Sequence, residues 1–208
     1  MRGVVLYGPG DVRVEERPDP VIVEPTDAII RVTTTCVCGS DLWPYRGVEK
    51  IDGPSPMGHE YVGIVEEVGD RVTMITPGQF VVGSFWASDD TCEICRSGYQ
   101  SACVHRVLMG LIGTQAERAR IPWADGTLVA TPETPPANLV PSLLAFSLVH
   151  LHGGPAPVRR FLPDLIEAIW TRQIDPGRVF DLDLPLEQAA EGYRAMDERR
   201  AIKTLLRP

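Results

Sequence analysis

Six residues of this chain combine zinc-binding side chains with the spacing of zinc ligands, and they form two groups. The first group is sparse: Cys38 and His59 have twenty residues between them. The second is compact and supplies a carboxylate and three thiols from one short stretch: Asp89, Cys92, Cys95 and Cys103. Thiolate sulfur, imidazole nitrogen and carboxylate oxygen are the donors that proteins offer to Zn²⁺. The sequence therefore predicts a zinc protein.

The compact group has the spacing of a structural zinc site. Two residues separate Cys92 from Cys95, and Cys103 follows after seven more. Structural zinc is closed and tetrahedral, so a fourth ligand is needed, and Asp89 lies three residues before Cys92. Asp90 is the alternative fourth ligand. A redox-active dithiol is the other interpretation, but it requires neither a third cysteine nor an acidic residue upstream.

The residues next to the sparse group favour a functional role for it, and they stand in Cys38-Gly39-Ser40-Asp41 and Gly58-His59-Glu60. An isolated cysteine is usually a small packed residue, and an isolated histidine usually has a structural hydrogen bond. Here Asp41 could accept the free ring N–H of His59 and fix its tautomer. Ser40 could pass on the proton of a zinc-bound alcohol. This arrangement indicates a catalytic zinc site.

The elements that must position these residues are mostly short strands separated by turns. Strands over 4–7 and 12–16 flank Gly8-Pro9-Gly10-Asp11 and predict a hairpin. Further β-rich runs have the spacing of a barrel and cover 28–36, 61–68, 80–85 and 118–121. We expect a β-barrel-like body in which Cys36 is a packed strand residue.

Helical patterns follow a proline-rich connector at 131–136. The apolar run 139–151 is expected to be a helix or an interface segment. One buried helix face has the i, i+3, i+4, i+7 spacing and consists of Leu162, Leu165, Ile166 and Ile169. A second amphipathic stripe predicts a helix over 186–196, and a strand is expected over 202–206.

Composition excludes several classes of function. The chain has 208 residues, a formal net charge of −8 and a pI near 5.0, so its field repels phosphate backbones and anionic lipid surfaces. We expect no nucleic-acid partner and no membrane association. The first ten residues lack the apolar core of a signal peptide, which favours a cytoplasmic protein. In that reducing compartment the five cysteines are expected to be thiols or metal ligands.

Taken together, these motifs resemble the zinc-dependent medium-chain alcohol dehydrogenases. The resemblance is carried, in order, by Cys38-Gly39-Ser40-Asp41, Gly58-His59-Glu60, Val68-Gly69-Asp70, Pro77-Gly78, the cysteine cluster, and the tail from Ala190 to Arg200. It implies a mainly β fold with some α, the GroES-like catalytic domain. Residues 1–147 would form this domain and 148–208 a helical and strand segment that returns to close it.

The same resemblance implies roles for the site residues. Cys38 and His59 would bind catalytic zinc, and Glu60 would lie beside it or act as an exchangeable ligand. Ser40 would begin the proton relay, and Asp41 would orient His59. The family uses zinc to lower the pKa of a bound alcohol, so that hydride passes to NAD(P).

Three departures from the family pattern concern the cofactor and the metal. No G-x-G-x-x-G motif is present, and residues 104–208 are too few for a dinucleotide-binding sheet of about 150 residues, so no Rossmann cofactor domain is expected. Leu148 stands where the family places a third ligand; Glu60, His150 or His152 would replace it, although the two histidines are more simply loop or strand residues. Trp43 stands where the family often has a relay histidine.

The sequence thus predicts the zinc-binding catalytic domain of an alcohol dehydrogenase-like oxidoreductase, acting on a small alcohol or aldehyde. Without an NAD(P) domain it should be inactive or impaired alone. The alternative is a non-catalytic zinc-binding module that forms homo-oligomers through an exposed apolar junction at 139–151. A zinc hydrolase with Glu60 as its base is a third possibility.

Overall fold

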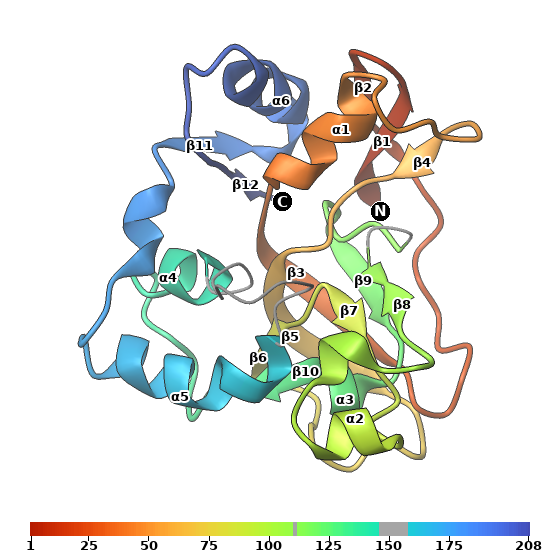
Figure 1. The fold of residues 1–208 in the computed structure, drawn as a ribbon, viewed down its shortest axis with the longest axis vertical. Helices are drawn as coiled ribbons and strands as arrows, with labels where there is room; N and C mark the ends of the chain where they lie inside the picture. The colour runs from red at the N-terminus through yellow and green to blue at the C-terminus, as the bar shows by residue number, and fades with distance from the viewer. Residues whose placement is uncertain (110–111, 146–157) are drawn as a thin grey trace.

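A computed structural model describes residues 1–109, 112–145 and 158–208. Its largest sheet is organised around β3 (Ala28–Cys36), in which seven of nine side chains are buried. Such a largely buried strand fits a position with neighbours on both edges and cover on both faces. The sheet has the order β10-β6-β5-β3-β12-β11, with β9 also paired to β3 (Figure 1). These strands are β5 (Tyr61–Val68), β6 (Phe80–Gly83), β9 (Arg118–Ile121), β10 (Leu128–Ala130), β11 (Leu182–Pro185) and β12 (Thr204–Arg207).

Two smaller sheets flank the large one. The predicted hairpin is confirmed as β1 (Arg2–Gly8) and β2 (Asp11–Glu16), which pair in antiparallel fashion, and β4 (Ser55–Pro56) joins β1 on its other edge. The third sheet consists of β7 (Trp86–Ala87) and β8 (Val107–Leu108). The strand expected over 80–85 is shorter than predicted: β6 (Phe80–Gly83) ends two residues earlier.

The described part of the chain has six α-helices around the sheets: α1 (Leu42–Tyr45), α2 (Glu93–Arg96), α3 (Ala124–Thr127), α4 (Val140–Ala145), α5 (Val158–Trp170) and α6 (Ala189–Asp197). Both predicted C-terminal helices are present, as α5 and α6. Among the residues described, no helix is long and apolar enough to cross a membrane. The expected fold class, mainly β with α, is confirmed.

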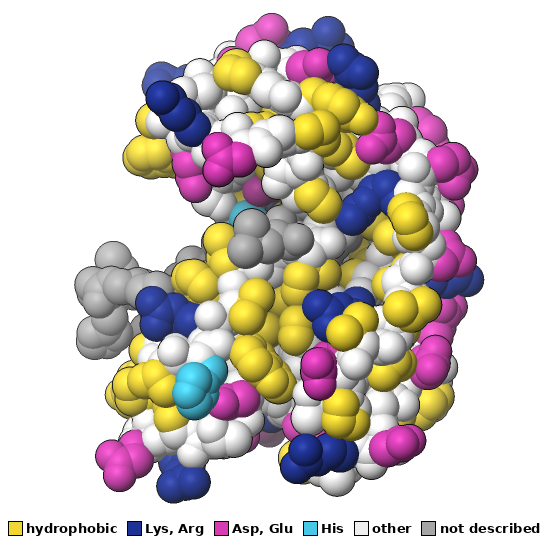
Figure 2. Space-filling model, turned by 90° about the vertical axis from the view of Figure 1, so that its right-hand side faces the viewer, with side chains coloured by type: hydrophobic (Ala, Val, Ile, Leu, Met, Phe, Trp, Pro, Cys, Tyr) yellow, Lys and Arg dark blue, Asp and Glu magenta, His cyan; other side chains and the backbone are white. Residues whose placement is uncertain are grey.

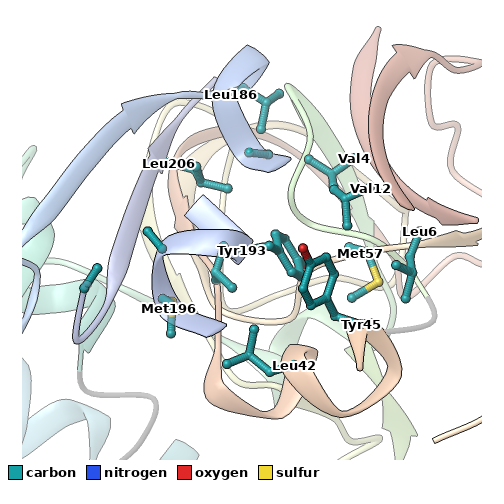
Figure 3. Packing of buried hydrophobic residues seen from close by; sticks show 14 residues of the cluster. Val4, Leu6, Val12, Leu42, Tyr45, Met57, Leu186, Tyr193, Met196 and Leu206 are labelled. Atoms are coloured by element: carbon teal, nitrogen blue, oxygen red, sulfur yellow. The ribbon is translucent and has the colours of Figure 1, made fainter. Parts of the chain in front are cut away.

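The core alternates across the large sheet as the two-residue period of a strand requires. Val81 belongs to one hydrophobic cluster with Ile30 and Tyr61, whereas Phe80 and Val82 belong to a second cluster with α4 and α5. A third cluster joins the hairpin, α1 and α6 (Figure 3). It thereby fixes the C-terminal helix beside the chain that leaves β3.

The apolar run 139–151 was expected to be exposed, and for its described part this is wrong. Leu139 and Val140 are each 6% exposed, and Leu143 and Leu144 are each 1% exposed. Their side chains pack in the cluster that α4 and α5 form against the sheet, because α4 presents apolar residues nearly all round. Residues 146–151 lie outside the described part of the chain.

Candidate metal centres

Cys38 lies directly beyond β3, where the chain turns sharply. The backbone N–H of Cys38 donates to Asp41 Oδ2 at 2.9 Å, and the N–H of Asp41 donates to the Cys38 carbonyl at 3.1 Å. This reciprocal cap closes a single 3-10 turn over Gly39–Asp41. The turn places Cys38, Ser40 and Asp41 so that all three line one cavity, which is described below.

His59 meets these residues from the segment before β5. Its Nδ1 lies 3.4 Å from Asp41 Oδ1, and its Nε2 lies 3.2 Å from Ser40 Oγ. The structure therefore brings together the three residues that the sequence predicted to cooperate. Burial lowers the pKa of His59, but contact with Cys38 and the charge of Asp41 outweigh it and raise the pKa to about 9.

Gly58 fixes the backbone from which His59 projects. It has φ +107°, and a Cβ atom added to it would lie 2.3 Å from the backbone nitrogen of Gln115. Hydrogen bonds from Thr114 N to the Gly58 carbonyl and from Gln115 N to the Met57 carbonyl hold the two segments together. Only glycine allows both this conformation and this close approach.

Glu60 is 1% exposed, and its two carboxylate oxygens have different surroundings. Its Oε2 accepts a hydrogen bond from Lys203 Nζ at 2.9 Å and contacts Cys36 Sγ. Burial raises the pKa of the Cys36 thiol, which is therefore a neutral donor. Glu60 Oε1 is buried and has no hydrogen-bond partner among the residues that the structure describes. A buried carboxylate oxygen without a partner is costly, and a metal ion would satisfy it.

The donor set at this centre fits zinc. Donor atoms of Cys38, His59 and Glu60 all lie within 4.8 Å of one another, and one sulfur, one nitrogen and one oxygen form an accepted zinc ligand set. Glu60, with its unpartnered oxygen, is the candidate for the third ligand. The other two candidates, His150 and His152, lie outside the described residues.

A cavity of about 800 Å³ opens beside this centre. Cys38, Ser40, Asp41 and His59 line one part of it. The rest of its wall combines apolar side chains with the charged residues Glu49, Lys50 and Asp52, and the apolar ones include Ile51, Pro54, Met57, Phe85, Trp86 and Leu108. The ring of Phe85 meets His59 edge-on at 6.4 Å. Figure 2 shows hydrophobic side chains gathered beside a hollow on one face of the molecule. Such a cavity suits an organic molecule with one polar end.

The compact group also converges. Sulfur atoms of Cys92, Cys95 and Cys103 lie within 4.8 Å of one another, and all three are free thiols. Backbone N–H groups near Val104 and Cys95 lower the pKa of Cys92 to about 7, whereas burial raises that of Cys95 to about 12. Three neighbouring sulfurs with one easily ionised thiol fit a zinc site.

Asp89, the expected fourth ligand, lies beside Cys103 and His105, and donor atoms of these three residues form a cluster separate from that of the three cysteines. Its Oδ1 lies 3.2 Å from Cys103 Sγ, and its Oδ2 lies 2.6 Å from Nδ1 of His105. Burial raises the pKa of Asp89, but hydrogen bonds from Thr91, Cys103 and His105 outweigh it and lower the pKa to about 2. The alternative ligand, Asp90, accepts a hydrogen bond from Gln100 instead.

Sequence reasoning missed the residues that support the two centres. Cys36 was expected only to pack, yet it contacts Glu60, and Lys203 pairs with Glu60 from 143 positions away. Neither contact leaves a local signal. His105 could have been found, because it stands two residues after Cys103 beside a predicted ligand set. Trp43, at the position of the expected relay residue, is 59% exposed.

Comparisons with known proteins place this sequence in a family. The family model for the alcohol dehydrogenase GroES-like domain matches residues 24–133, more than half of the chain. The chain belongs to the zinc-dependent medium-chain alcohol dehydrogenase family. A zinc-type alcohol dehydrogenase B from Aspergillus flavus is 46% identical over 136 residues, which are 64% of this chain and 32% of that protein. A medium chain reductase/dehydrogenase from Acremonium is 42% identical over 136 residues, which are 64% of this chain and 47% of that protein.

This member of the family spans about a third to a half of the length of those two relatives. The alcohol dehydrogenase TADH from Thermus has a similar structure, with a TM-score of 0.87 and 21% identity, covering 100% of this chain and 99% of that one. That likeness shows the fold. The family is that of zinc-type oxidoreductases, and the chain carries its catalytic-domain fold.

Proposed function

We propose that this domain binds zinc through Cys38, His59 and Glu60 and uses it in the interconversion of an alcohol and a carbonyl compound with NAD(P). The observation that carries the proposal is the convergence of these three donors, with a Glu60 oxygen that has no partner among the described residues, beside the cavity that Cys38 and His59 line. Bound zinc supplies a Lewis acid that lowers the pKa of an alcohol. The remaining roles belong to side chains of the domain.

Ser40 is proposed to take the proton of the alcohol, since its hydroxyl faces the donor set and is open to solvent. Asp41 is proposed to hold His59, because its Oδ1 lies against Nδ1 and leaves Nε2 for the metal. The apolar wall around Phe85 and Trp86 would bind the carbon chain of the substrate and exclude water. The substrate class is therefore an alcohol or aldehyde with a hydrophobic body.

We propose that Asp89, Cys92, Cys95 and Cys103 hold a second, structural zinc. Their loop connects β7 to β8 through two short helical turns, α2 and Gln100–Ala102. So little regular structure cannot order a loop of this length without a further constraint, and a metal with four ligands supplies one. Its role is to fix the loop, not to meet substrate.

We further propose that these 208 residues, tested alone, turn over slowly. Among the strands described, only β11 and β12 pair in parallel, whereas a dinucleotide-binding fold is built on a parallel sheet. This supports the sequence argument that the nicotinamide must come from elsewhere, such as another domain or chain. The hydrolase alternative has less support, because Lys203 and Cys36 already occupy Glu60 Oε2.

The test combines metal analysis with cofactor binding on zinc-replete protein. We expect two zinc ions per chain, one after Cys38→Ala, and no saturable quenching or enhancement of NADH fluorescence at micromolar concentrations. Alcohol-dependent NAD(P) reduction should stay close to that of Cys38→Ala. A wild-type chain that retains only one zinc would refute the catalytic site, and tight NADH binding would refute the proposed impairment.

A further inference from the structure

Gln115 is a fully buried residue whose side-chain amide donates hydrogen bonds beside the candidate zinc site of Cys38, His59 and Glu60, the first metal centre. It is 0% exposed. Its Nε2 donates to the Cys36 carbonyl at 2.9 Å and to Asp41 Oδ2 at 3.1 Å. Its Oε1 accepts a hydrogen bond from the Tyr193 hydroxyl at 3.0 Å. Both N–H donors and the amide oxygen are therefore used, and the orientation of the amide is fixed.

This amide decides which oxygen of Asp41 meets His59. Asp41 Oδ2 accepts from both the Cys38 N–H and Gln115 Nε2, and Oδ1 is left facing His59 Nδ1. A continuous chain of contacts thus runs from Tyr193 through Gln115 and Asp41 to His59. All its members are buried or nearly so, and in such surroundings a missing partner is costly.

Tyr193, the first member of this series of hydrogen-bonded contacts, is distant from the others in the sequence. It belongs to α6 and lies 78 positions from Gln115. Its ring packs against Tyr45 at a centroid distance of 5.3 Å, and Figure 3 shows the two rings together in the cluster under α6. The ring therefore serves packing, whereas the hydroxyl alone reaches Gln115. The hydroxyl of Tyr45 takes no part in this chain of hydrogen bonds.

We propose that Tyr193 and Gln115 are positioning residues for the metal centre, and that α6 controls zinc affinity through them. This inference rests on the proposed function, because it requires zinc at Cys38, His59 and Glu60. Groups that hydrogen-bond to metal ligands are worth about 10–100-fold in metal affinity. Gln115 acts on such a group directly and Tyr193 acts one hydrogen bond further out, so their effects should be graded.

The experiment measures zinc affinity at each site by competition with a chromophoric chelator, and the cobalt spectrum at each site. Tyr193→Phe removes one hydroxyl, and Tyr45→Phe is the matched control from the same cluster. Gln115→Met removes the amide at similar volume, and circular dichroism verifies folding. We expect zinc at the first centre to bind about 3–10-fold more weakly in Tyr193→Phe and about 10–100-fold more weakly in Gln115→Met. Tyr45→Phe should match the wild type.

The cysteine cluster is the internal control, since three thiolates give it a cobalt spectrum distinct from that of a one-thiolate site. Its affinity should stay constant in all variants. The inference is overturned if Tyr193→Phe behaves like Tyr45→Phe, or if both sites weaken together, which is the result of general destabilisation. A wild-type chain without metal at the first centre would overturn the proposed function itself, and this inference with it.

Discussion

Replacing Lys203 by methionine should leave Glu60 as an uncompensated buried charge. The two side chains are 7% and 1% exposed and form an ion pair at 2.9 Å. Methionine keeps most of the length and the apolar stem of lysine, so lost packing contributes little. Removal of one partner from a buried pair costs about 3–5 kcal/mol. The contact of Lys203 with the Phe180 ring, at 5.9 Å, accounts for about 0.5 kcal/mol of this.

The assay is urea unfolding of a double-mutant cycle in metal-free protein, because Glu60→Gln also removes a proposed zinc ligand. At an m value of about 2 kcal/mol/M, Lys203→Met should lower the midpoint by about 2 M. Adding Glu60→Gln removes the stranded charge, so the double variant should recover more than half of the loss. Saturating zinc should also reduce the loss in Lys203→Met, because a metal at Glu60 offsets the same charge.

Two results would refute this prediction: a small loss of stability in Lys203→Met, or additive losses in the double variant. If Lys203→Met costs less than about 1 kcal/mol, the pair behaves like an exposed salt bridge. If the two single losses simply add in the double variant, Glu60 and Lys203 do not interact, and the buried ion pair is not what holds Glu60.

Three further predictions concern other parts of the two sites. Gly58→Ala should lower the free energy of unfolding by about 3 kcal/mol or more, as measured by urea unfolding, whereas Gly53→Ala, with φ +111° but open space around its Cβ, should cost only about 1–2 kcal/mol. Cys95→Ser should remove one zinc per chain by metal analysis and lower stability by more than about 4 kcal/mol. In metal-free protein the raised pKa of His59 stabilises the fold fully below about pH 6.5, and this contribution disappears as the pH rises through about 9. Zinc affinity at its site should therefore rise up to about tenfold per pH unit over that window, with proton release detectable by calorimetry.

Local sequence was sufficient to select the candidate ligands but not the residues that support them. The hairpin, β3, β5, β9 and both C-terminal helices follow from periodicity and turn residues, and the Asp41–His59 contact follows from motif chemistry. Lys203 and Tyr193 could not be assigned in this way, because a lysine before a strand and a tyrosine on a helix stripe have ordinary local explanations. Their partners are set by tertiary packing over 143 and 78 positions.

The exposed patch expected at 139–151 is wrong in its described part, 139–145, for a related reason. A run of apolar residues shows that a segment must be covered, but it does not show by what. In the described part, α4 meets α5 and the face of the sheet that carries Phe80 and Val82. The covering surface is formed by α5, which begins seven positions after the run, and by Phe80 and Val82, which lie more than fifty positions before it, so composition alone could not reveal it.

The position of β12 in the sheet has a consequence for folding during synthesis. It pairs with β3, and Lys203 directly precedes it. At about 5–20 residues per second, the 143 positions between Glu60 and Lys203 take about 7–30 s to translate. For that time β3 has an open edge beside Cys36, and Glu60 has no ammonium partner. We therefore expect the surroundings of Glu60 to be completed only after Lys203 and β12 have been synthesised.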